Sequence, residues 1–103
     1  MYKLEYLPAA VRDMTEIVRY ISQKLQNPGA ASSLADEMVQ AADSLCEFPY
    51  AHPMHKTIRP LKHEYRRIIV QNYLMFYWVD EEQKTVTVAR VIYARRDYPK
   101  MLN

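Results

Sequence analysis

The chain has 103 residues, one glycine, one cysteine and a formal net charge of +2. This length suits one compact domain, so we expect a single domain over residues 1–103. One glycine excludes phosphate-binding loops, and one cysteine excludes an intrachain disulfide and a cysteine-rich metal site. No apolar run is long enough to span a membrane, and the first ten residues do not resemble a signal peptide, so we expect a cytoplasmic protein.

The charges are divided unevenly between the two halves of the chain. Residues 1–51 carry four Lys/Arg and seven Asp/Glu, a balance of −3, whereas residues 52–103 carry ten and five, a balance of +5. A basic half beside an acidic half predicts a surface that meets a polyanion or an acidic partner. The alternative is a basic face that only contacts solvent.

The N-terminal half begins as a strand followed by a helix. Residues 2–7 alternate apolar and polar side chains, which is typical of a strand, and Pro8 suits the first turn of a helix. Apolar residues then recur at steps of three and four, which predicts one packed stripe on a helix: Val11, Met14, Val18, Ile21 and Leu25.

A second helix follows the sequence Asn27-Pro28-Gly29, and its expected stripe is Ala31, Leu34, Met38, Ala41, Leu45 and Phe48. We expect Asn27 to be the N-cap, Pro28 the first helical residue and Gly29 part of the turn between the helices. Two such stripes joined by a short loop predict an antiparallel helical hairpin.

The rest of the chain is typical of a sheet. The sequence Phe48-Pro49 ends the second helix, and a proline-containing connection follows to residue 63. Strands are expected at 64–70, 73–79 and 85–94, separated by short polar turns. The predicted fold is α+β in the order βααβββ, a mostly antiparallel sheet with an N-terminal two-helix hairpin packed on one face.

Basic and aromatic side chains concentrate in this sheet. Arg66 and Arg67 are adjacent, so a strand would point them to opposite faces. Arg90 interrupts an apolar strand, and its burial would require a partner. With Lys62, Arg95 and the interleaved tyrosines, these arginines are candidates for binding RNA or another target. Cross-strand packing of tyrosines with a solvated basic rim is the alternative.

Other polar residues give weaker signals. His63 enters the Arg66–Arg67 strand and is a candidate acid or base, or an exposed spectator. Asp13 and Glu16 are expected on a solvated helix surface, and Cys46 is expected to be a buried or idle thiol, not a nucleophile. The three histidines lack further ligands at metal-like spacing, so we expect neither a metal nor a cofactor.

In their order along the chain, these features resemble the RelE/ParE superfamily, the toxins of type II toxin–antitoxin modules, of the plasmid stabilisation type. The similarity rests on the opening strand, the helix with Tyr20-Ile21, the sequences Asn27-Pro28 and Phe48-Pro49, Tyr65-Arg66-Arg67, Asn72 to Tyr77, and Arg90-Val91-Ile92-Tyr93 before Arg95-Arg96-Asp97. The resemblance implies the fold predicted above and a small toxin held inactive by a cognate antitoxin protein.

The resemblance implies two possible targets. RelE-like members cut mRNA in the ribosomal A site without a metal, and in that case Arg66, Arg67 and Arg96, with His63 or Tyr98, would form the catalytic site. ParE-like members inhibit DNA gyrase. Leu74 stands where RelE-like nucleases often carry an arginine, so we favour the ParE-like interpretation slightly. A non-toxic relative that survives as a binding module is the third possibility.

Overall fold

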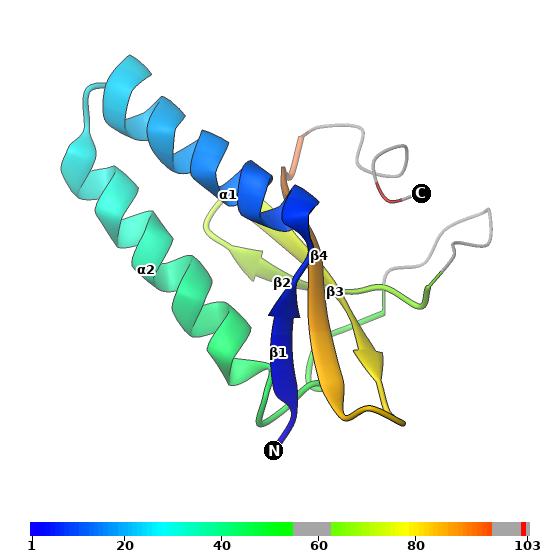
Figure 1. Cartoon of the computed structure of the whole chain (residues 1–103). Coiled ribbons are helices and arrows are strands. Elements are labelled where there is room, and N and C mark those ends of the chain that lie inside the picture. Colours follow the sequence, from blue (N-terminus) through cyan, green and yellow to red (C-terminus); the bar gives the residue numbers. More distant parts are fainter. Residues whose placement is uncertain (55–62, 96–101, 103) are drawn as a thin grey trace.

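The computed structural model describes residues 1–54, 63–95 and 102. Its elements are β1 (Lys3–Tyr6), α1 (Pro8–Arg19), the π-helix η1 (Tyr20–Lys24), α2 (Pro28–Ser44), β2 (Arg66–Val70), β3 (Tyr73–Asp80) and β4 (Thr85–Tyr93). The two helices form a hairpin beside a single sheet (Figure 1). The predicted α+β fold and its βααβββ order are therefore confirmed.

The sheet has the strand order β1-β4-β3-β2. The two C-terminal hairpins pair antiparallel, and β1 pairs parallel with β4 from Lys3 opposite Thr85 to Tyr6 opposite Val88. The register of β3 against β4 shifts between Phe76 and Tyr77, where a bulge places one extra residue on β4. The first strand therefore lies beside the last, and β2 forms the opposite edge.

The main core lies between the helices and the sheet. Ala10, Leu34 and Met38 from the helices pack with Met75 and Val88 from the two central strands, and all five are at most 1% exposed. Alternation along β3 sends every second side chain to this face. Burial of these apolar surfaces stabilises the attachment of the hairpin to the sheet.

The stripe that α1 buries differs from the predicted one. The core-facing residues of α1 and η1 are Ala10, Met14, Ile17 and Ile21. Val11 and Leu25, both expected to be buried, are 50% and 56% exposed. Val11 belongs to a second apolar stripe that α1 carries beside the first. Leu25 is displaced because its N–H bonds to the carbonyl of Tyr20 in a π-type turn, which rotates the following residues.

The N-cap and the first residue of α2 are as predicted, whereas the place of Gly29 and the end of the helix are not. Asn27 caps the helix, since its side chain accepts a hydrogen bond from the N–H of Ala30 at 3.1 Å, and Pro28 is the first helical residue. Gly29 lies within the first helical turn, and Gln26, with φ of 51°, adopts the left-handed conformation of the connection. Since α2 ends at Ser44, Phe48 leaves the helical phase and is 65% exposed.

The face of the sheet opposite the hairpin, called the open face below, carries a second cluster. It contains Tyr65, Leu74, Phe76, Ala89, Ile92 and the C-terminal Leu102. The hydroxyl of Tyr65 donates to the carbonyl of Leu102 at 2.9 Å. No helix within the described ranges has the length and apolar character needed to cross a membrane.

Candidate functional site

The two adjacent arginines of β2 occupy opposite faces of the sheet, as predicted. Arg66 pairs with Tyr77, which packs among the helix-side residues, and Arg67 pairs with Phe76 of the open face. The guanidinium of Arg66 lies 4.9 Å from the ring centroid of Tyr50, and its Nη1 donates to the carbonyl of His52 at 2.9 Å. Arg66 is thus directed at the segment after α2, away from Arg67.

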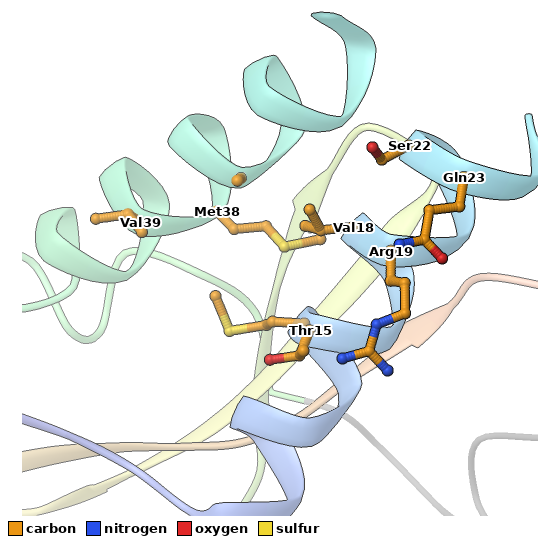
Figure 2. A pocket seen from close by; sticks show the side chains of 9 residues that line it. Thr15, Val18, Arg19, Ser22, Gln23, Met38 and Val39 are labelled. Carbon is orange, nitrogen blue, oxygen red and sulfur yellow. The ribbon is translucent and has the colours of Figure 1, made fainter. Parts of the chain in front are cut away.

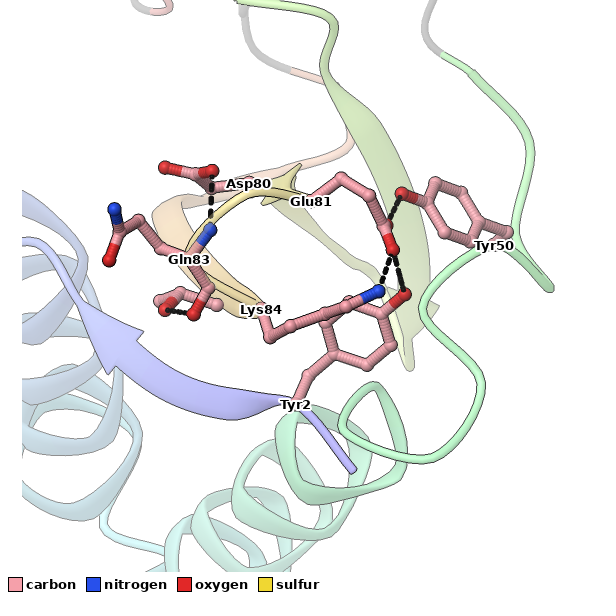
Figure 3. A network of polar contacts seen from close by, with 7 residues as sticks. Tyr2, Tyr50, Asp80, Glu81, Gln83 and Lys84 are labelled. Carbon is pink, nitrogen blue, oxygen red and sulfur yellow. Dashed lines mark hydrogen bonds and ion pairs between the residues drawn. The ribbon is translucent and has the colours of Figure 1, made fainter.

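A polar network fixes that segment to the β3–β4 turn (Figure 3). The carboxylate of Glu81 accepts hydrogen bonds from the hydroxyls of Tyr2 and Tyr50 and pairs with Lys84. These bonds, the Lys84 bond first, lower the pKa of Glu81 to about 2. The bond to Glu81 also raises the pKa of Tyr50 to about 12. Glu81 therefore holds Tyr50 in place, and the guanidinium of Arg66 lies over the ring of Tyr50.

Arg90 has the partner that its position in an apolar strand requires. Its Nε and Nη2 donate to the carboxylate of Asp13 at 2.7 and 3.0 Å. Asp13 also accepts from the backbone N–H of Val91 at 3.0 Å. The expectation that Asp13 lies on a solvated face is therefore wrong. The pairing of β1 reaches only Val88, so the edge of β4 beyond it needs another acceptor, and α1 supplies Asp13.

His63 lies against the open face in an aromatic cluster. Its ring stacks on Trp78, with centroids 3.7 Å apart and planes 9° apart. Tyr65 meets both rings edge-on, at centroid distances of 6.1 Å from His63 and 5.8 Å from Trp78. The half-buried His63 is thus a packed side chain, and it is neither exposed nor hydrogen-bonded to an arginine in the described part of the chain.

The remaining candidates are dispersed or lie outside the described residues. Arg95 is exposed in the turn after β4, whereas Lys62, Arg96 and Tyr98 fall outside the described residues. Within the described ranges, His, Cys, Asp and Glu form no group of three that could hold a metal ion. Cys46 is half-buried, and desolvation raises the pKa of its thiol.

The helix hairpin presents a groove that the sequence interpretation missed. Met14, Val18 and Val39 line a cavity of about 440 Å³ between the two helices. In Figure 2 the side chains of Val18 and Met38 point toward one another across this gap. A neighbouring cavity of about 430 Å³, bounded by Leu4, Val11 and Val39, extends the groove toward β1. The sequence does carry a signal for this groove, which is the second apolar stripe of α1. The prediction missed it because it assigned a single stripe of five residues to this helix.

Comparisons with known proteins identify the class to which this fold belongs. The chain is similar in structure to a chain of the chromosomal ParDE toxin–antitoxin system from P. aeruginosa, with a TM-score of 0.73, 15% identity, and coverage of 92% of this chain and 98% of that one. It is also similar to chains of the intact E. coli RelBE complex (TM-score 0.64, 18% identity, 93% and 100% covered) and of the isolated E. coli RelE toxin (TM-score 0.64, 17% identity, 98% and 93% covered). The fold is thus that of the RelE/ParE toxins.

The sequence places the chain more narrowly. The family model described as "ParE toxin of type II toxin-antitoxin system, parDE" matches residues 4–98. The chain therefore belongs to the ParE toxin family of type II toxin–antitoxin systems. A search of the curated proteins finds no match.

Proposed function

We propose that this chain is a growth-inhibiting toxin that acts by binding a protein target, DNA gyrase, and not by cutting mRNA. The observation that carries the proposal is the divergence of Arg66 and Arg67. Metal-free cleavage by a 2′-hydroxyl needs cationic groups that converge on one phosphate to stabilise its developing charge. Arg66 is directed toward Tyr50 and His52 on the helix side, whereas Arg67 occupies the open face.

The open face gives a second line of support. Leu74, which stands where RelE-like nucleases often carry an arginine, is 6% exposed within the cluster that Leu102 completes. Phe76, the cross-strand neighbour of Arg67, is fully buried in the same cluster. The centre of this face is therefore apolar and covered. Such a surface favours packing within the domain over the binding of an RNA phosphate. The match to the ParE family points the same way.

A cognate antitoxin is the second partner that we propose, and the groove between α1 and α2 is its candidate site. Val11 and Val39 remain 50% and 47% exposed there, above the buried Met38. An amphipathic segment that placed apolar side chains along this groove would cover both valines. We expect Val39→Glu to weaken antitoxin binding at least tenfold, because it places an unpaired charge in the interface. Gln40→Glu adds the same charge at the neighbouring exposed position and is the matched control.

The target is tested by assaying the purified full-length chain against gyrase and against translating ribosomes in parallel. We expect inhibited supercoiling, intact mRNA, and arrested growth on expression. Cleaved mRNA with intact supercoiling would overturn the proposal, and loss of that cleavage in Arg67→Ala would then place a nuclease site on the open face. Unaffected growth, supercoiling and mRNA would instead identify a non-toxic binding module.

A further inference from the structure

A second cleft lies on the other side of α1, away from the groove between the helices. It has a volume of about 600 Å³ and opens where the end of α1 and η1 pass the start of β3 and the end of β4. Its lining includes Glu16, Ile17, Tyr20, Leu25, Tyr73 and Tyr93, and the Asp13–Arg90 pair forms one wall. Neither the proposed binding of gyrase nor the proposed antitoxin groove assigns a function to this cleft.

The side chains around this cleft are unusually exposed for their type. Tyr20 is 54% exposed, Leu25 56% and Tyr93 38%. The rings of Tyr73 and Tyr93 form a cross-strand pair with centroids 5.6 Å apart, and Tyr20 is near enough to contribute to the raised pKa of Tyr73, after desolvation and Tyr93. Tyrosines that combine a large apolar ring with a polar end are the residues that anchor protein interfaces.

The π-helix is what places this surface beside the strands. The hydrogen bond from the N–H of Leu25 to the carbonyl of Tyr20 encloses one residue more than an α-helical turn, and it moves Leu25 off the core-facing stripe. Single π-turns cost some hydrogen-bond geometry and are frequent at functional sites. Here the turn leaves Leu25 exposed at the cleft while Ile21 still packs in the core.

The described residues that line the cleft include two carboxylates and one cation. Asp13 and Arg90 satisfy each other through two hydrogen bonds. Glu16 is exposed one helical turn from Asp13 and forms no direct ion pair with a described side chain, although Arg90 also interacts with it electrostatically. Arg90 is the only cation among the described residues of the lining, so the balance of Asp13, Glu16 and Arg90 is −1. An anionic side chain would be repelled, and an apolar one would desolvate Glu16 without a partner.

We propose that this cleft receives an arginine side chain of a protein partner, with its guanidinium on the Glu16 carboxylate and its stem among the tyrosine rings. Arginine fits better than lysine because a planar guanidinium stacks on tyrosine faces while it donates to a carboxylate. A cleft of about 600 Å³ has room for this side chain and part of the backbone that carries it. The inference is independent of the identity of the toxin's target.

The test is an amide NMR titration of the full-length chain with three small probes. N-acetyl-arginine amide should shift the signals of the cleft residues with an affinity on the order of millimolar, as expected for one anchored side chain. N-acetyl-citrulline amide, which keeps the shape and lacks the charge, should bind at least fivefold more weakly. N-acetyl-leucine amide should behave like the citrulline probe.

Two variants and one control keep the test specific. Glu16→Gln and Tyr20→Ala should each weaken the arginine probe at least threefold, and Asp36→Asn, an exposed carboxylate on α2 outside the cleft, should not. Equal binding of the three probes would show a merely apolar cleft and overturn the proposal. Shifts spread over the whole surface, or no shift at about 50 mM probe, tens of times the expected dissociation constant, would also overturn it.

Discussion

The carboxylate of Asp13 holds the end of β4 and the cation of Arg90 together, so its removal should be costly. Asp13→Ala deletes three hydrogen bonds, of 2.7, 3.0 and 3.0 Å, which the N–H of Val91 and the Nε and Nη2 of Arg90 donate to this carboxylate. Breaking a fully buried pair costs about 3–5 kcal/mol. The two side chains here are 13% and 25% exposed, so Arg90 can regain some water. We therefore expect a loss of about 2–3 kcal/mol in the free energy of unfolding, near the value for one or two charged hydrogen bonds.

Chemical denaturation and thermal melting of the purified chain measure this loss. A domain of this size should melt roughly 10–20 °C lower, at about 4–8 °C per kcal/mol. Asp13→Asn keeps one acceptor oxygen and should lose about half as much, and a cycle with Arg90→Met should show a coupling of about 1–2 kcal/mol. Asp36→Asn, an exposed carboxylate on α2, is the control and should change stability by less than about 0.5 kcal/mol. If Asp13→Ala matched that control, the structural role assigned to Asp13 would be refuted.

Three further outcomes follow from the same packing. Because the pKa of Glu81 falls from 4.5 to about 2 on folding, its stabilising contribution is full above pH 4.5 and is lost as the pH falls through about 2. Glu81→Gln should flatten this acid limb of the stability profile, and Glu82→Gln should leave it unchanged. Leu102→Ala should loosen the open face and red-shift the emission of Trp78, the single tryptophan, and an unchanged spectrum would argue against that packing. Met38→Ala, at a fully buried site, should cost about 2–5 kcal/mol by denaturation, and a loss below about 1 kcal/mol would contradict its place in the core.

The order of elements could be predicted because each one carries its own local signal. Alternation marked the first strand, short polar turns bounded the later strands, and steps of three and four marked the helices. The sequence Asn27-Pro28 fixed the start of α2 through an N-cap and a residue with a pre-set φ, and both are present in the structure. These signals depend only on neighbouring residues, so the sequence alone was sufficient for them.

Features that depend on competition between similar local choices could not be predicted in this way. The helix α1 is apolar on two adjacent stripes, and only the sheet decides that Ile17 faces the core while Val18 faces the groove. The π-turn at Tyr20 differs from an α-helical turn only in the carbonyl that accepts the hydrogen bond, and no residue type in this segment predicts that difference. Asp13 looked solvated because its partner, Arg90, is distant in sequence and meets it only after α1 packs along β4.

The contacts in the structure also change how the uneven charge of the two halves is interpreted. Five of the ten cations in residues 52–103 lie in the described ranges, and three of these have partners within the domain. Arg66 donates to a carbonyl, Lys84 pairs with Glu81, and Arg90 pairs with Asp13. Among the described cations of this half, only Arg67 and Arg95 have no side-chain partner within the described ranges, so part of the +5 balance is engaged in contacts inside the domain. Recognition of partners should therefore depend on the apolar groove between α1 and α2 and on the aromatic cleft more than on the net charge of the sheet, and binding in the groove should weaken little when the ionic strength rises.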